Sequence, residues 1–128
     1  MLEYLETPRR ASLRPTDGIW VRVHDPVTAL SGRRYQVEGR IVFEIHDPFF
    51  DRTIKVELEG GPDGAECRIT KQPPDLVLDM EDLGACYLGW ARFRNLARAG
   101  RVGGERQALA KADIMFGWDP VPWCPEIF

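Results

Sequence analysis

Two segments with alternating apolar side chains constrain the fold of this chain more than any other feature. Their apolar positions are Ile41, Phe43, Ile45, Ile54, Val56 and Leu58. Because successive side chains of a strand point to opposite faces, both segments are predicted to be strands with one apolar face and one mostly charged face. Residues 47–51 connect them, and the turn at Gly60–Gly64 returns the chain as a third strand through residues 65–69. This pattern predicts antiparallel pairing.

Shorter segments on either side complete the predicted strands. Residues 19–23 alternate well enough for a strand, and a short helix is predicted to follow, with Asp25 as its N-cap and Pro26 at its first position. After two consecutive prolines, the apolar run at residues 75–79 is typical of a more buried strand.

The second half of the chain is predicted to be helical. One helix begins at Asp79 or Glu81 and is stopped by Gly89, a second is ended by Gly100, and a third is ended by Gly117. Several strands followed by helices favour an α+β fold, with a mainly antiparallel sheet of about five strands and helices packed on one face.

The last segment, residues 117–128, has a composition that is unusual for a chain end. It contains two tryptophans and three prolines, and it finishes with Ile127 and Phe128. Termini are usually polar and frayed, and prolines exclude a helix or a central strand. We therefore interpret the segment as a stiff extended arm that holds one group, the α-carboxylate of Phe128, at a fixed place.

Length and composition indicate one ordinary globular domain. The chain has 128 residues, 44% of them apolar and 29% charged, with a net charge of −3. We assign residues 18–128 to the domain and residues 1–17 to a linker and the remnant of a preceding domain, so we expect a piece of a longer protein. We expect a cytoplasmic location and no nucleic-acid or membrane partner. The three cysteines, Cys67, Cys86 and Cys124, are expected to be reduced and buried.

Four segments together resemble a known family. Residues Asp17–Arg22, Gly60–Ala65, Asp75–Gly89 and Trp123–Phe128 resemble the C-terminal domain of the enhanced intracellular survival (Eis) family of bacterial N-acetyltransferases. That domain is similar in fold to sterol carrier proteins. The four segments occur in the family's order and spacing, and they extend from Asp17 to the last residue.

The resemblance implies a function for the end of the chain. In that family two acetyltransferase-fold (GNAT) domains precede this one, the first binds acetyl-coenzyme A, and a tyrosine there acts as general acid. The free C-terminal carboxylate reaches that active site as general base, and this role carries over to Phe128. The implied partners are the GNAT domains of the same parent chain, which is expected to be a homo-oligomer. Glu126 is a candidate for attracting a cationic substrate, although a solvated glutamate is the simpler interpretation.

No cofactor site is expected within the chain itself. Acetyltransferase-fold proteins bind the pyrophosphate of acetyl-coenzyme A with a glycine-rich loop at a helix N-terminus. The nearest candidate, Arg101–Gly104, does not fit that loop pattern, and its glycines are predicted to form a turn between the last two helices. No metal ligands are assigned, because His24–Asp25 and His46–Asp47 are interpreted as strand ends followed by Asp-capped turns.

Two other functions remain open from the sequence. A free-standing sterol carrier-like module would bind a lipid or another apolar ligand in a tunnel lined by Phe49, Phe50, Trp90 and Phe93. A purely structural domain would fold the arm away from any cleft.

The five arginines between residues 90 and 106 are interpreted as a solvated helix face, with the aromatic residues among them pointing inward. A nucleophilic cysteine is not expected.

Overall fold

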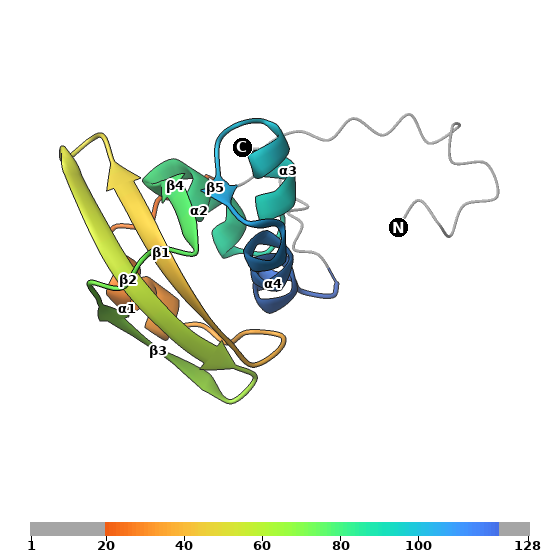
Figure 1. The fold of residues 1–128 in the computed structure, drawn as a ribbon. Helices are drawn as coiled ribbons and strands as arrows, with labels where there is room; N and C mark the ends of the chain where they lie inside the picture. The colour runs from red at the N-terminus through yellow and green to blue at the C-terminus, as the bar shows by residue number, and fades with distance from the viewer. Residues whose placement is uncertain (1–19, 121–128) are drawn as a thin grey trace, which may run out of the picture.

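The computed structural model describes residues 20–120, in which a five-stranded sheet is covered by helices (Figure 1). The strands follow the order β3-β2-β1-β4-β5 across the sheet. The elements in chain order are α1 (Pro26–Ser31), β1 (Gly39–Asp47), β2 (Arg52–Gly61), β3 (Gly64–Ile69), β4 (Leu76–Asp79), α2 (Met80–Tyr87), α3 (Phe93–Arg98), β5 (Gly103–Gly104) and α4 (Arg106–Phe116). The predicted α+β class is confirmed.

Strand pairing follows the alternating pattern of the sequence. β1 pairs antiparallel with β2, so that Phe43 lies opposite Val56, and β2 pairs antiparallel with β3. On its other side β1 pairs parallel with β4, and Phe43 lies opposite Leu76. The sheet is therefore mainly antiparallel, with one parallel pair at its centre that the sequence pattern did not indicate.

The apolar face of the sheet and all these helices share one core. Leu30 of α1, Leu83 of α2, Phe93 of α3 and Phe116 of α4 are each at most 1% exposed, and they belong to the same buried cluster as Phe43 of β1. The Phe93 and Phe116 rings meet edge to face at 5.0 Å. The predicted packing of helices on one face is confirmed, and the space between sheet and helices is occupied by side chains.

The opposite face of the sheet is charged. The Glu57 carboxylate, only 5% exposed, lies between the guanidinium groups of Arg40 and Arg68, and Lys55 Nζ lies 2.9 Å from Glu44. Hydrogen bonding to Arg40 and the nearby charge of Arg68 together outweigh burial and hold the pKa of Glu57 below its usual value. Cross-strand ion pairs stabilise this face, and their arginine and lysine side chains are partly exposed to solvent.

Two sequence predictions about the sheet are wrong. Residues 20–23 do not form a strand, because this segment runs beside α2, where a Cβ on Gly84 would collide with the carbonyl oxygen of Val21. The fifth strand is instead Gly103–Gly104, which was predicted to be a turn and which pairs antiparallel with β4. A Cβ on Gly104 would collide with Leu76, so this close approach depends on glycine.

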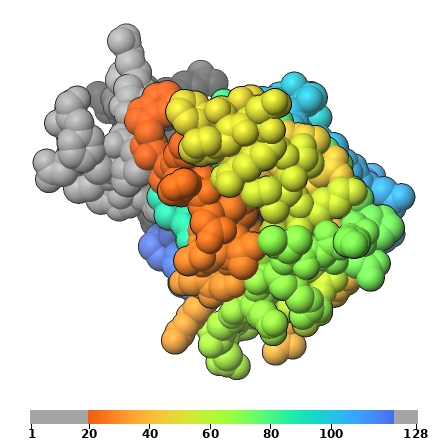
Figure 2. Space-filling model, turned by 90° about the vertical axis from the view of Figure 1, so that its left-hand side faces the viewer, coloured from red at the N-terminus to blue at the C-terminus, as the bar shows by residue number. Residues whose placement is uncertain are grey.

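Local helix signals were more reliable. Asp25 caps α1, since its Oδ1 accepts a hydrogen bond from Val27 N at 3.1 Å, and Pro26 occupies the first helical position. α2 begins directly after Asp79, and α4 ends directly before Gly117. In Figure 2, which views the molecule from the left of Figure 1, α1 and the residues before it (orange) lie beside β2 and β3 (yellow and green).

No helix within residues 20–120 is long and apolar enough to cross a membrane.

Cys67 and Cys86 are buried and free, and burial raises the pKa of their thiols to about 11 and about 12. Both groups are therefore protonated at neutral pH, which agrees with the prediction of reduced, buried cysteines for this pair. Cys124 lies outside the described residues.

Candidate functional site

The predicted site residues, Phe128 and Glu126, lie outside the described part of the chain, but the start of the arm that carries them lies within it. α4 ends at Phe116, and the chain continues through Gly117 and Trp118 to Pro120. We call residues 116–118, together with the side chains that contact them, the arm root. Its geometry determines where the arm begins.

Arg33 joins the arm root to a second helix end. Its guanidinium donates to the carbonyl oxygen of Tyr87, the last residue of α2, and to that of Phe116, the last residue of α4, at 3.2 Å in the second case. The last carbonyl groups of a helix lack intrahelical partners and carry partial negative charge. One guanidinium group therefore supplies hydrogen bonds to the last carbonyl groups of two helices.

Three aromatic rings surround the same guanidinium. The Arg33 Cζ atom lies 4.6 Å from the ring centroid of Phe116, 4.7 Å from that of Tyr35 and 5.5 Å from that of Tyr87. Burial lowers the pKa of Arg33, and interactions with Tyr35 and Tyr87 partly offset that effect. Because the pKa of arginine begins above 12, the group stays charged. The cation is held by packing as well as by hydrogen bonds.

Further hydrogen bonds fix the last turn of α4. Arg92 Nη1 donates to the carbonyl oxygen of Asp113 at 2.9 Å, and Arg94 Nε donates to the Asp113 carboxylate at 2.6 Å. Gln36 N donates to the carbonyl oxygen of Met115 at 3.0 Å. The end of α4 is thus attached to α3 and to the segment after α1. No local sequence signal indicated these contacts, because the partners are far apart in the chain.

The turn after α2 packs directly on the arm root. Gly89 has a φ of +82°, and a Cβ at this position would lie 2.6 Å from the Phe116 carbonyl oxygen and 3.4 Å from Trp118 N. Both the backbone conformation and the close approach require glycine. The residues on either side of Gly89 therefore lie next to the first residues of the arm.

Exposed apolar side chains surround the arm root. Leu88 is 39% exposed, Trp90 65% and Trp118 48%. We call these three residues the root patch. The prediction that Trp90 points inward is wrong, because Trp90 lies in the turn before α3 begins, where helical spacing does not apply. Phe93, which is inside α3, is fully buried as predicted.

The prediction of a solvated arginine face is only partly correct. Arg94 and Arg101 are about half exposed, but each binds a buried carboxylate. Arg101 Nη2 lies 2.6 Å from Asp82 and 3.0 Å from Glu81. Together with Arg92, these arginines are engaged in tertiary structure, so their charge is partly compensated within the domain.

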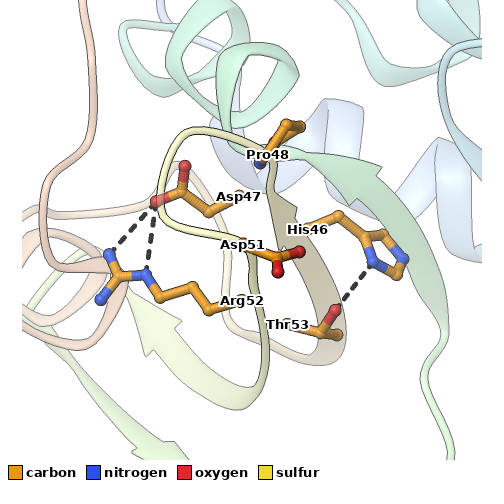
Figure 3. A pocket seen from close by; sticks show the side chains of 6 residues that line it. All are labelled: His46, Asp47, Pro48, Asp51, Arg52 and Thr53. Atoms are coloured by element: carbon orange, nitrogen blue, oxygen red, sulfur yellow. Dashed lines mark hydrogen bonds and ion pairs between the residues drawn. The ribbon is translucent and has the colours of Figure 1, made fainter.

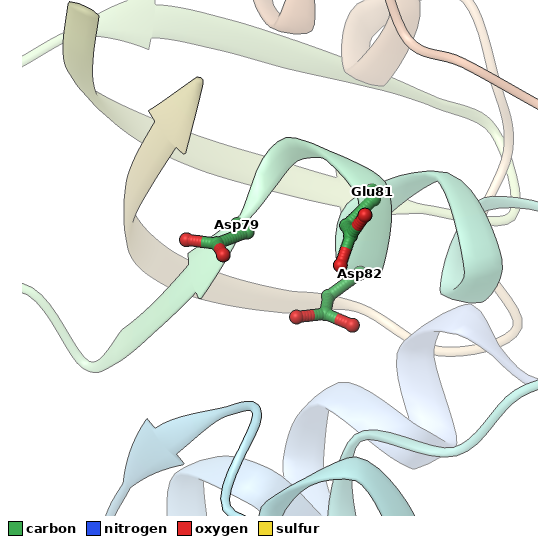
Figure 4. Close-up of side chains that lie close together, drawn as sticks. All are labelled: Asp79, Glu81 and Asp82. Carbon is green, nitrogen blue, oxygen red and sulfur yellow. The ribbon is translucent and has the colours of Figure 1, made fainter. Parts of the chain in front are cut away.

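Asp79, Glu81 and Asp82 form an acidic cluster at the start of α2 (Figure 4). One carboxylate oxygen from each lies within 4.8 Å of the others, and carboxylates are the ligands that Ca²⁺ and Mg²⁺ prefer. Burial raises the pKa of Asp82, and the charge of Arg101 partly offsets that effect. Because Arg101 pairs with two of the three carboxylates, a structural ion-pair cluster explains this arrangement.

A small polar pocket lies at the β1–β2 turn (Figure 3). It has a volume of about 170 Å³ and is lined by His46, Asp47, Pro48, Asp51, Arg52 and Thr53. His46 contacts Thr53 at 3.0 Å, and its ring points away from the Asp47 carboxylate, so the two do not form a catalytic pair. Burial favours a raised pKa for Asp47, but Arg22 and Arg52 outweigh it and hold that pKa below its usual value.

The residues predicted to line an apolar tunnel are not brought together. Phe93 is buried in the core, Phe49 and Phe50 are 77% and 48% exposed in the β1–β2 turn, and Trp90 lies beside the arm root. Lipid-sized ligands need apolar cavities of at least about 300 Å³. The pocket at the β1–β2 turn is smaller than that and polar.

The sequence pattern of the sterol carrier protein domain matches residues 26–125. The chain belongs to the sterol carrier protein domain family. It is 40% identical over 122 residues to an uncharacterized N-acetyltransferase of Streptomyces coelicolor. The matched region covers 94% of this chain and 30% of that relative. It is also 32% identical over 107 residues to N-acetyltransferase Eis of Mycobacterium tuberculosis, covering 80% of this chain and 25% of Eis.

Two solved structures of N-acetyltransferases are also similar in fold to this chain. Eis1 of Mycobacterium abscessus superposes with a TM-score of 0.66 at 29% identity, over 81% of this chain and 26% of Eis1. A GCN5-related N-acetyltransferase of Anabaena variabilis superposes with a TM-score of 0.71 at 26% identity, over 80% of this chain and 26% of that protein. The resemblance to the sterol carrier-like domain of the Eis family is confirmed. The chain spans less than a third of the length of these relatives.

Proposed function

We propose that this chain is the sterol carrier-like domain of an Eis-type N-acetyltransferase and that it supplies the free α-carboxylate of Phe128 as general base. The active site that receives this group belongs to the acetyltransferase part of the parent protein. The observation that carries the proposal is the arm root, where Arg33 and Arg92 fix the last turn of α4. An arm that begins at a fixed point can deliver its end reproducibly.

The chemistry requires a proton acceptor. Acetyl transfer from acetyl-coenzyme A to an amine needs a neutral nitrogen, so an ammonium group must lose a proton before or during attack on the thioester. A positioned carboxylate within hydrogen-bond reach accepts that proton and contributes about 10²- to 10⁴-fold to the rate. A misplacement of the catalytic group by about 1 Å lowers the rate on the order of a hundredfold. The arm must therefore start from a rigid attachment point. In the same active site Glu126 would attract a cationic amine.

Acetyl-coenzyme A would be bound elsewhere in the parent. The glycines of the candidate loop, Gly103 and Gly104, form β5 and pair with β4, while Arg101 binds Asp82. These backbone and side-chain groups are already used within the domain, which supports assigning the coenzyme to a GNAT domain of the parent. Assembly of the parent into a homo-oligomer stays a prediction.

The test is an extension of the C-terminus in the full-length parent protein. Adding Gly-Ser after Phe128 converts the carboxylate into a peptide carbonyl and should lower kcat about a hundredfold or more, with an unchanged thermal unfolding temperature. The matched control carries the same two residues at the N-terminus of the parent and should keep normal kcat. An extended enzyme with normal turnover would exclude the general-base role.

A further inference from the structure

The root patch differs from an ordinary scatter of exposed apolar residues because its members are neighbours. Gly89 contacts the backbone of Phe116 and Trp118, which places Leu88 and Trp90 next to the start of the arm. Contiguous exposed apolar surface marks interaction sites, and tryptophan is enriched among residues that dominate binding. Within residues 20–120, the indole rings of Trp90 and Trp118 have no aromatic or cation–π partner.

The backbone beneath the patch is already fixed. Arg33 binds the carbonyl oxygens that end α2 and α4, and Leu88 and Trp118 follow those helix ends within two residues. Binding to a surface of this kind orders little additional backbone, so less conformational entropy is lost on association. The patch therefore has the rigidity expected of a permanent interface.

The reach of the arm limits what can cover the patch. Eight residues follow Pro120. A fully extended chain spans at most about 3.3–3.6 Å per residue, so Phe128 lies within about 29 Å of Pro120. If the Phe128 carboxylate acts inside another domain, the mouth of that active site is closer still. The surface beside Trp118 then lies within that reach of the other domain.

We propose that the root patch is the surface on which the acetyltransferase part of the parent protein docks. This inference rests on the proposed function, since the arm that starts in the patch is the group that enters the active site. The contacting surface would be apolar and would offer an acceptor for an indole N–H, because buried tryptophans usually find one. Docking would align the arm before substrate binds.

The experiment uses the full-length parent with Trp90→Ser and, separately, Leu88→Ser. Ile69→Ser is the matched control, because Ile69 is 75% exposed at the end of edge strand β3. Differential scanning calorimetry and kcat are measured for each. The patch variants should separate one cooperative transition into two and lower kcat about tenfold or more, while the control keeps one transition and normal kcat.

The outcomes separate this inference from the proposed function. A patch variant with one transition and kcat within twofold of the parent overturns the docking proposal. A patch variant that keeps one transition but changes the sedimentation mass overturns it as well, because the patch then joins copies of the protein. If the patch variants uncouple the domains while the C-terminally extended enzyme stays fully active, docking stands and the general-base role fails.

Discussion

The arm root and the β1–β2 turn are built on the same plan with opposite charges. At the root, the cation Arg33 binds two helix carbonyl groups beneath exposed apolar side chains. At the turn, the anion Asp47, 1% exposed, binds Arg22 at 2.7 Å and Arg52 at 3.3 Å beneath exposed phenylalanines. Each cluster ties together segments that are distant in the chain.

The two clusters differ in what happens to their exposed aromatic rings. At the turn, Arg22 lies 5.1 Å from the Phe49 ring and Arg52 lies 5.0 Å from the Phe50 ring, and His24 stacks on Phe50. The domain's own cations thus engage these rings. The indoles of Trp90 and Trp118 have no such partner within the described ranges. The turn is complete within the domain, whereas the root offers surface to another domain.

The largest effect should follow the loss of the Arg33 guanidinium. Arg33→Met in this chain should lower the free energy of unfolding by about 2–4 kcal/mol, because it removes charge-assisted hydrogen bonds and cation–π contacts. Urea denaturation followed by circular dichroism measures the change. The neighbouring Arg34→Met serves as control and should change stability by less than about 0.5 kcal/mol. A similar small change for both variants would mean that Arg33 does not hold the two helix ends.

The next effect isolates the packing at the root. Gly89→Ala and Gly100→Ala both place alanine at positive φ, +82° and +74°, but a Cβ meets Phe116 O only at Gly89. Each variant should lose about 1 kcal/mol through backbone strain. Gly89→Ala should lose a further 1 kcal/mol or so through the collision. Equal losses in urea denaturation would show that the turn after α2 does not press on the arm.

At the turn, the distinguishing property is pH dependence. The folded-state pKa of Asp47 lies below its unfolded value, so its ion pairs stabilise the fold above about pH 4 and this contribution is lost as the pH falls through the folded-state pKa. Asp47→Asn should therefore lower the Tm at pH 7, and the difference from the unmodified chain should shrink toward pH 3. A Tm difference that is constant with pH would exclude an ionic role.

The smallest effects compare the exposed rings directly. In the isolated chain, Phe49→Ser should lower the free energy of unfolding by about 0.5–1 kcal/mol, because its ring contacts Arg22. Trp90→Ser, although it removes a larger ring, should change stability by less than about 0.5 kcal/mol. The same denaturation assay measures both. A larger loss for Trp90→Ser would make Trp90 a structural residue and remove the contrast between the two regions.

The sequence predicted those elements whose signals are local. Alternation over residues 41–45 and 54–58 located β1 and β2, and the Asp25–Pro26 pair located the start of α1, since burial periodicity and capping act over a few residues. Glycines at 103–104 carry no strand signal, and their pairing with β4 depends on a tertiary contact. The strand prediction is wrong at residues 20–23 for the same reason, because that segment is placed by its contact with α2.

The candidate site was harder to predict. Arg33 binds carbonyl groups 54 and 83 residues farther along the chain, so nothing near it in the sequence indicated its role. The exposure of Trp90 depends on its position in a turn between two helices, which helical spacing does not reveal. The role of Phe128 was inferred from a resemblance and from the composition of the arm, and it stays a prediction.

The general-base role of Phe128 is tested most directly by the pH profile of the full-length parent made with a C-terminal amide. Ligation of a synthetic C-terminal peptide gives two proteins that differ only at the Phe128 carboxyl group. If Phe128 supplies the general base, the amide should lower kcat/KM about a hundredfold or more and remove the rise with pH that reports the free base. The same rates and the same pH profile in both proteins would contradict it.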